Sequence, residues 1–412
     1  MKRNFLYNLI LLAISAEALL GIALADEKAA SQKNIKAVVE GNNRFAFDLY
    51  KKLVTHPDAQ KQDGNLFFSP YSISTALAMT YAGARGETQK QMAEVLHFSL
   101  PQDCLHPALG VLQRQLNSGG EKGGYQLRVA NALWGQKGYG FLQEFIKLTE
   151  KNYGAGLWEV DFINETEKAR RNINAWVERK TEDKIKELIK KGILGGDTVL
   201  VLTNAIYFKG DWQVQFDKKD TKESQFMISA KNKVKVPMMY LKEDFNYCSD
   251  ENLQVLELPY KGEHLSMIVL LPKQIGGLQR IEQLLTPGNL NIWLQKLHKQ
   301  EIIVYLPKFK MTWGAFELKD ILIDMGMPAA FIDADFSGIS GNRELFISNV
   351  LHKAFVEVNE QGTEAAAATA VAMKATSIGP VFRADHPFIF LIKDNQSGSI
   401  LFTGRVMNPA GQ

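Results

Sequence analysis

The spacing of hydrophobic residues changes near residue 195 of the 412-residue chain. Before that point, apolar residues recur three or four positions apart, which predicts helices over residues 37–55, 69–84, 87–96, 106–116, 141–152 and 164–191. Two strands are also expected, one over residues 127–134 and one just after the change, over residues 199–208. The second is a nearly continuous apolar run, which indicates a strand covered on both faces.

Strands dominate after residue 195. Residues 253–258 and 265–271, joined across a turn that contains Gly262, predict a hairpin. Further strands are expected at residues 302–307, 345–358 and 388–407, and helices at 278–285, 292–299 and 316–325. This order predicts an α+β fold, and the sequence contains no Pro-, Ser- or Gly-rich linker that would divide it into domains.

A stretch of unusual composition, residues 360–387, separates the last two β-patterned segments and reads EQGTEAAAATAVAMKATSIGPVFRADHP. Its alanines favour a surface helix that starts near Gly362-Thr363. At the period of a strand, Glu364 and Lys374 share one face. The other face then carries only uncharged residues, namely Thr363, Ala365, Ala367, Thr369, Val371, Met373 and Ala375. The residues leave both conformations open.

The first 25 residues have the organisation of a cleaved signal peptide. Lys2 and Arg3 form a basic head, residues 9–16 an apolar centre, and residues 23–25 a small-residue cleavage pattern. An uncleaved membrane anchor is the alternative, which the polar residues inside the segment disfavour. We therefore expect a secreted protein, extracellular or periplasmic, whose mature chain 26–412 does not associate with a membrane.

Charge and cysteine content narrow the class further. The formal net charge of +3 is close to neutral for this length, so nothing argues for a nucleic-acid partner. Two cysteines, Cys104 and Cys248, exclude a disulfide scaffold, and two free thiols are expected rather than one bridge. Asn164 and Asn395 each begin an Asn-x-Ser/Thr triplet that fits the pattern for glycosylation.

Motifs for catalysis are missing from the sequence. It contains no Gly-x-Ser-x-Gly, His-Glu-x-x-His, Cys-x-x-Cys or phosphate-binding Gly-x-x-x-x-Gly-Lys segment. The seven histidines are scattered at spacings that form no metal site. We therefore expect no enzyme, no metal and no cofactor, with an exported hydrolase as a remote alternative.

Five motifs spread from about residue 40 to the end resemble the serpins, protease inhibitors that act by inserting a reactive loop into a sheet. The hinge of that family is similar to Glu360-Gln-Gly362-Thr363-Glu364-Ala365-Ala366-Ala367-Ala368-Thr369. The other four are NLFFSPYSI at 65–73, TNAIYFKGDW at 203–212, ADFSGI at 334–339 and the segment 386–409. The resemblance implies an inhibitory, secreted serpin of the prokaryotic type. It also implies a single serpin domain, 26–412, with helices around a large central mixed sheet, smaller sheets and an exposed reactive loop, 360–387.

The resemblance also implies a mechanism. A target serine protease cleaves the loop, and the acyl-enzyme is retained while the loop inserts as a central strand. Family spacing places the cleaved bond at Thr376-Ser377, with Met373, Lys374 and Ala375 as alternative cleavage positions. A small β-branched residue before the bond suggests elastase-like or subtilisin-like targets, with cysteine proteases as a second class. The protein is expected to be a metastable monomer.

Two groups of polar residues match family positions around the sheet. Ser69, Ser72, Asn204 and His352 resemble the shutter cluster beneath the strands that separate. Trp212, Lys308 and Glu360 resemble the breach, where the hinge first enters the sheet. Ordinary capping, core packing and a surface ion pair are the alternatives for these residues. A non-inhibitory serpin, acting as a carrier or chaperone, is the alternative function.

Overall fold

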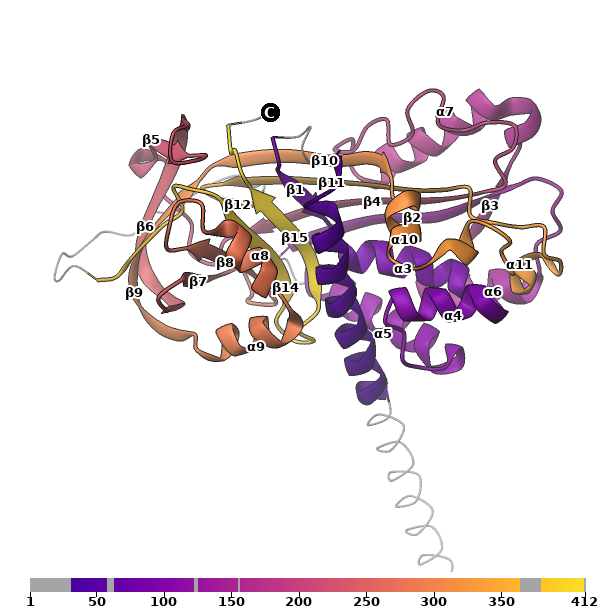
Figure 1. Ribbon diagram of the computed structural model, residues 1–412, viewed down its shortest axis with the longest axis horizontal. Helices are drawn as coiled ribbons and strands as arrows, with labels where there is room; N and C mark the ends of the chain where they lie inside the picture. Colours follow the sequence, from indigo (N-terminus) through magenta and orange to yellow (C-terminus); the bar gives the residue numbers. More distant parts are fainter. Residues whose placement is uncertain (1–30, 58–62, 122–124, 155, 364–378, 411–412) are drawn as a thin grey trace, which may run out of the picture.

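The computed structural model describes residues 31–57, 63–121, 125–154, 156–363 and 379–410 (Figure 1). The predicted signal peptide and residues 364–378 of the predicted loop therefore lie outside the described residues.

Most of the helical residues precede residue 181, as the hydrophobic pattern predicts. A helix over residues 31–53 is followed by five further helices, α3 (Pro70–Tyr81), α4 (Gly86–Val95), α5 (Gln102–Glu121), α6 (Gln143–Tyr153) and α7 (Phe162–Lys180). Short helices interrupt the later strands, namely η1 (Lys218–Asp220), α8 (Leu278–Leu284), α9 (Pro287–Gln295), α10 (Lys319–Asp324), η2 (Pro328–Ala330) and α11 (Ser337–Ser340). The α+β prediction is confirmed.

A mixed six-stranded sheet forms the centre of the molecule. Its order is β10 (Phe309–Glu317), β11 (Asn349–Asn359), β12 (Gly362–Thr363), β4 (Leu200–Asp211), β2 (Tyr125–Gln136) and β3 (Leu157–Val160). β11 also pairs directly with β4, in parallel, beyond the end of β12. The other pairs are antiparallel except for β2 with β3.

A second sheet, of nine strands, packs beside the first. Its order is β1 (Leu66–Phe68), β15 (Ile400–Val406), β14 (Phe388–Asp394), β8 (Leu265–Pro272), β7 (Leu253–Pro259), β6 (Lys233–Ser249), β9 (His298–Pro307) and β13 (Val381–Arg383). The remaining strand, β5 (Lys222–Met227), pairs with β6. The predicted hairpin of residues 253–271 is the antiparallel pair β7–β8.

The six-stranded sheet is buried on both faces, which explains the continuous apolar run in β4. Leu202 and Ile206 face the larger core, on the side of α3. Val201 and Ala205, which alternate with them, join a second core with Ile173 of α7. Figure 1 shows α7 on one side of the sheet and α3 to α6 on the other.

The helix predicted over residues 164–191 ends earlier, at Lys180. The side chain of Asn174 bonds both the N–H and the C=O of Ile189, each at 2.9 Å, and so folds the following segment back against α7. Glu182, Asp183 and Glu187 have positive φ angles within this segment. The apolar residues that suggested a longer helix are therefore buried by an irregular chain.

Two other helix boundaries differ from those that the hydrophobic spacing predicts. Residues 309–317 form the strand β10, so only the second half of the helix predicted at 316–325 exists, as α10. The helix predicted at 292–299 begins earlier, after Thr286, whose hydroxyl caps α9, and His298 already starts β9. Pairing with β11 and with β6 explains the two strands, because neighbouring strands supply hydrogen bonds that a local pattern does not reveal.

Candidate functional site

The first residues of the predicted hinge that the sheet contains, Gly362 and Thr363, lie between β11 and β4. These strands pair in parallel from Asn349 with Val201 to Phe355 with Tyr207. Beyond that point β12 lies between them and pairs antiparallel with both. The two residues of β12 therefore separate the strands at one end, and the part in which β11 pairs directly with β4 forms a closed seam.

Gly362 is required at the point of entry. Its φ of +151° is one that other residues rarely adopt. A Cβ at this position would lie 2.1 Å from the carbonyl oxygen of Gly210 and 2.6 Å from the Cα of Asp211. Only glycine lets the chain approach β4 this closely.

The side chain of Thr363 points into the protein interior and is completely buried. Its Oγ1 lies 3.0 Å from the hydroxyl of Tyr260, so the two hydroxyls share a hydrogen bond. The ring of Tyr260 stacks on that of Trp212, with 4.8 Å between the centroids. Burial raises the pKa of Tyr260 well above its ordinary value, so the hydroxyl stays protonated. The inward position at the hinge thus accepts a small polar side chain.

The turn before β12 is held by Trp212. Its backbone N–H donates to the carbonyl of Gln361 at 2.9 Å, and its indole N–H donates to the carbonyl of Asn359 at 3.0 Å. The N–H of Phe216 donates to the carbonyl of Glu360 at 2.8 Å. These bonds fix the direction in which the hinge leaves β11.

The carboxylate of Glu360 is buried, with only 4% of the side chain exposed. Lys308 donates to it at 2.9–3.0 Å, and the hydroxyl of Thr221 donates at 2.9 Å. Burial raises the pKa of Glu360, but the hydrogen bonds from Lys308, its own backbone and Thr221 outweigh this, so the pKa lies below its ordinary value. The three residues predicted for the breach, Trp212, Lys308 and Glu360, lie together at this end of the sheet. Tyr260 and Thr221, which the sequence did not single out, complete the group.

Within the closed seam, His352 of β11 and Asn204 of β4 occupy directly paired positions. Nδ1 of His352 donates to Oδ1 of Asn204, and its Nε2 accepts from the backbone N–H of Ser69 at 3.4 Å. Burial lowers the pKa of His352 to about 3. The imidazole is therefore neutral, which is the form that can donate at one nitrogen and accept at the other.

The two serines at the start of α3 complete this cluster. Ser69 caps the helix by accepting from the N–H of Ser72 at 3.1 Å, and its hydroxyl donates to the carbonyl of Leu401 at 2.6 Å. The amide of Asn204 donates to the hydroxyl of Ser72. All four residues predicted for the shutter therefore lie in one hydrogen-bonded network that links β11, β4, α3 and β15.

Asn131 of β2 is a fifth member that the sequence analysis missed. Its Oδ1 accepts from Asn204 and from the hydroxyl of Ser72, the latter at 3.0 Å. In the sheet register it pairs with Asn204, so His352, Asn204 and Asn131 form a row across three adjacent strands. An asparagine within the apolar strand pattern at 127–134 was the one available signal.

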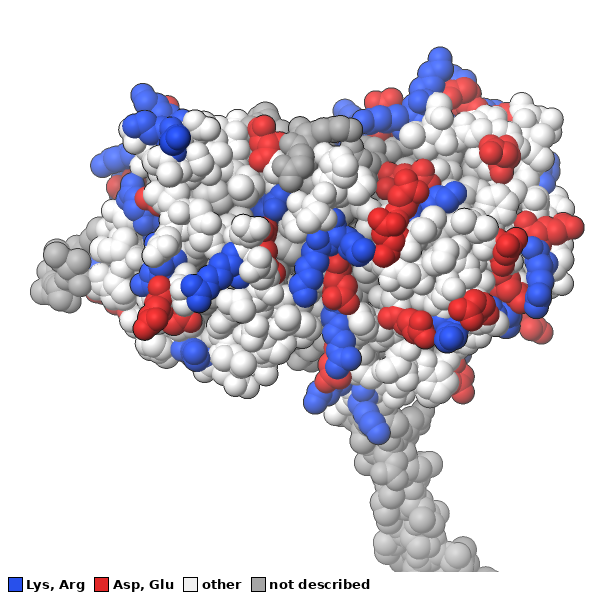
Figure 2. Space-filling view, in the orientation of Figure 1, with Lys and Arg blue, Asp and Glu red and all other residues white. Residues whose placement is uncertain are grey.

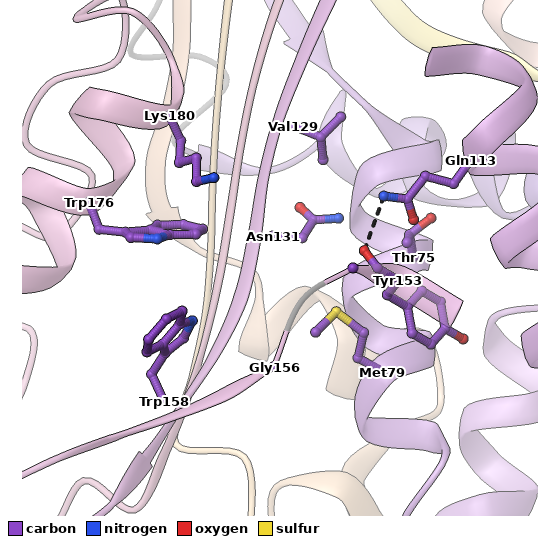
Figure 3. Close-up of a pocket in the computed structure, with 11 residues that line it drawn as sticks. Thr75, Met79, Gln113, Val129, Asn131, Tyr153, Gly156, Trp158, Trp176 and Lys180 are labelled. Carbon is purple, nitrogen blue, oxygen red and sulfur yellow. Dashed lines mark hydrogen bonds between the residues drawn. The ribbon is translucent and has the colours of Figure 1, made fainter. Parts of the chain in front are cut away.

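A cavity of about 180 Å³ lies beside Asn131 at the edge of β2 (Figure 3). Gln113 and Thr75 line it on the side of the helices, and Trp158 and Trp176 on the opposite side of the strand. Asn131 therefore stands between the buried cluster and this cavity.

The remaining predicted residues are not placed. The hinge residues Glu364, Ala365, Ala366, Ala367, Ala368 and Thr369, the cleavage positions Met373, Lys374 and Ala375, and the bond Thr376-Ser377 lie outside the described residues. The chain resumes as β13, which pairs in parallel with β9. Cys104 and Cys248 are both free, as expected.

The described residues offer neither a cluster of metal ligands nor a membrane-spanning helix. Within that part of the chain, no group of three or more His, Cys, Asp or Glu side chains could hold a metal ion. No helix in the same residues combines the length and the apolarity needed to cross a bilayer.

Comparison with known proteins gives consistent matches over most of the chain. A family model described as serpin (serine protease inhibitor) matches residues 40–409. The leukocyte elastase inhibitor of Sus scrofa is 46% identical over 379 residues, which cover 89% of this chain and 98% of that protein. Uncleaved ovalbumin is similar in structure, with a TM-score of 0.82, 31% identity, and coverage of 90% of this chain and 100% of that chain. The thyroxine complex of human thyroxine-binding globulin is also similar in structure, with a TM-score of 0.83 and 33% identity. The match covers 91% of this chain and 99% of that chain.

The prediction of a secreted protein is wrong by this comparison. The leukocyte elastase inhibitors to which the chain is similar are intracellular proteins that lack signal peptides. The expected prokaryotic type is likewise unsupported, because these relatives come from vertebrates. A basic head before an apolar run is a short pattern of low information content, which explains how it could mislead.

Proposed function

Because the chain belongs to the serpin family, we propose that it inhibits serine proteases as a suicide substrate. Its fold is the serpin fold, and it is not an enzyme. One observation carries the proposal: Gly362 and Thr363 already occupy the sheet between β11 and β4, and the rest of the seam consists of a single ladder. A strand that continued from Thr363 would enter this seam.

The reaction proceeds through a covalent intermediate. The hydroxyl of the protease serine attacks the carbonyl carbon of Thr376, the bond to Ser377 breaks, and Ser377 leaves with a free amino group. The ester between the protease and Thr376 is normally hydrolysed by water. Loop insertion drags the protease along before hydrolysis, and a displacement of its catalytic groups by about 1 Å slows that step by about 100-fold. The alternative bonds at Met373, Lys374 or Ala375 would leave a shorter segment to insert.

The energy for this step comes from the sheet. An inserted strand of about 14 residues replaces one ladder by two, which adds about 14 hydrogen bonds at a net value of about 1 kcal/mol each. The drive is therefore on the order of 10 kcal/mol, comparable with the whole stability of a typical domain. The intact protein is accordingly a metastable state, closed by the cluster around His352 and by the contacts of Trp212.

The target class follows from the residue before the cleaved bond. Thr376 is small and β-branched, which suits the shallow pocket of elastase-like or subtilisin-like proteases. The name of the similar leukocyte elastase inhibitor agrees with the first of these. Cysteine proteases are a second class that could form the corresponding thioester. We also propose that the loop spans residues 360–387 of a single domain and that the protein acts as a monomer.

Incubation with a panel of serine proteases tests the proposal. We expect a complex that survives denaturing electrophoresis, with the ester located at Thr376 by mass spectrometry, and a cleaved protein whose melting temperature is far above that of the intact one. Cleavage in the loop without either a covalent complex or thermal stabilisation would refute the proposal. That result would favour a carrier function, to which the similarity with thyroxine-binding globulin points.

A further inference from the structure

An exposed, lysine-rich segment lies beside the last residues of the predicted loop. Residues 217–235, which we call the basic hairpin, comprise η1, β5 and the start of β6. The basic hairpin contains three carboxylates (Asp217, Asp220 and Glu223) and six exposed lysines (Lys218, Lys219, Lys222, Lys231, Lys233 and Lys235). Its net charge of +3 equals that of the whole chain, so the other residues sum to zero. Figure 2 shows the lysines gathered at the corner where Figure 1 places β5.

Carboxylates accompany only the first three lysines of the basic hairpin. Asp217 forms an ion pair with Lys219 at 2.7 Å, and all three carboxylates precede residue 224. At the tip, Lys233 reaches the amide oxygen of Gln225 at 3.2 Å. Within the described part of the chain, no ion pair engages Lys231, Lys233 or Lys235. Asp385, whose backbone carbonyl contacts the hairpin at Met227, has its carboxylate bound by Arg383 and His386.

The basic hairpin is fastened to the C-terminal stem of the reactive loop. Arg383 of β13 donates to the hydroxyl of Ser224 of β5 at 2.8 Å, and its guanidinium lies 4.3 Å from the ring centre of Tyr305. The N–H of Met227 donates to the carbonyl of Asp385 at 2.7 Å. A groove of about 460 Å³ runs between the two elements, lined by Lys222, Ser224, Tyr240, Tyr305 and Arg383 together with Asp220, Glu223 and Met238.

An attacking protease must cover this surface, given the function proposed above. Val381, where β13 begins, follows Ser377 by four residues, which can span at most about 14 Å. A specific protein interface buries about 800 Å² on each partner, a patch roughly 30 Å across. An enzyme centred on the cleaved bond therefore overlaps β13 and the basic hairpin attached to it.

We propose that the basic hairpin is a docking surface for proteases that carry carboxylates around their active-site cleft. Exposed charges at the edge of an interface act mainly on the association rate and on the choice of partner. The lysines at the tip would accelerate encounter with an acidic protease and slow encounter with a basic one. Binding of a linear polyanion is the alternative, and the heparin measurement below tests it.

Binding to catalytically inactive subtilisin tests the docking surface apart from the trapping mechanism, because this enzyme cannot form the ester. The probe is subtilisin whose nucleophilic serine is replaced by alanine, used as isolated and after succinylation, which converts its surface lysines into carboxylates. The hairpin variant is K231Q/K233Q/K235Q. The matched control is K90Q/K147Q/K151Q, which removes the same charge from exposed positions on α4 and α6 at the other end of the molecule.

At low salt, we expect the wild type and the control to bind succinylated subtilisin about tenfold faster than the untreated form. The hairpin variant should lose most of this difference, and 1 M NaCl should abolish it for all three proteins, because the Debye length is then about 3 Å. Equal rates for the hairpin variant and the wild type would overturn the proposal. A second result would also overturn it: heparin binds the wild type but not the hairpin variant, while subtilisin binds both at the same rate. This result would identify the hairpin as a polyanion site.

Active subtilisin supplies the second readout. If no covalent complex forms while salt-dependent binding persists, the trapping mechanism fails and the docking surface stands. If a complex forms at the same rate with the hairpin variant and with the wild type, for both forms of subtilisin, the mechanism stands and the docking surface is refuted.

Discussion

His352 of β11 and Asn204 of β4 face each other at paired positions of the closed seam, and a hydrogen bond from Nδ1 to Oδ1 joins their side chains. Any strand that enters the seam must separate these two residues. The same bond therefore stabilises the closed sheet and opposes the insertion on which the proposed inhibition depends.

The substitution His352→Ala should loosen the seam. It leaves Oδ1 of Asn204 and the N–H of Ser69 without their partner in a buried site, at a cost of about 1–3 kcal/mol for each group. We expect faster spontaneous insertion or polymerisation on mild heating, measured by native electrophoresis over time. His298→Ala, at an exposed position, is the control. Unchanged polymerisation of the His352 variant would show that the bond does not restrain the seam.

Acidification should destabilise the intact protein through the same residue. Burial lowers the pKa of His352 to about 3, whereas an unfolded histidine has a pKa of about 6.5. Between these values the unfolded state binds more protons, so stability falls as the pH decreases from about 6.5 towards 3. The slope from this residue is at most about 1.4 kcal/mol per pH unit.

Melting temperatures between pH 7 and pH 5 check this dependence. His106 contributes in the same direction, because burial lowers its pKa to about 4. We expect the His352→Ala variant to lose part of the slope and a double variant that also carries His106→Phe to lose more. A slope identical to that of the wild type in both variants would mean that other groups control the acid sensitivity.

The substitution Thr363→Arg should convert the inhibitor into a substrate. The Thr363 side chain is completely buried against Tyr260, and a guanidinium there would be desolvated without an anionic partner. We expect the loop to be cleaved at least tenfold more often per trapped enzyme, measured as the stoichiometry of inhibition. Thr363→Ser keeps a small hydroxyl and should trap normally. Undiminished trapping by the arginine variant would argue against entry of the hinge at this position.

The substitution Asn131→Ala should loosen the closed seam less than His352→Ala does. Its side chain accepts from Asn204 and Ser72 but is only partly buried, so water can replace some of its bonds. We expect Asn131→Ala to polymerise at a rate between those of the wild type and His352→Ala. A double variant should be less affected than the sum of the two changes, because both residues act through Asn204. Strict additivity would indicate that they act separately.

The sequence alone determined the order of the elements and the chemistry of the hinge. Amphipathic spacing and apolar runs are local properties, so they predicted the helices α3 to α6 and the buried strand β4. Gly362, Thr363 and the motifs around Ser69, Asn204 and His352 were readable for the same reason, since each is a short contiguous pattern. The leader pattern was equally local, and the comparison with related proteins contradicted it.

Only the tertiary structure decided which residues meet. The row of Asn131, Asn204 and His352 depends on the register between strands that are far apart in the chain, and periodicity within one strand does not specify that register. The partner of Thr363 is Tyr260, about 100 residues away, and the irregular segment after α7 follows from the bonds between Asn174 and Ile189. Such contacts form only when distant segments pack, and so Asn131 and Tyr260 could not be assigned to these groups from the sequence.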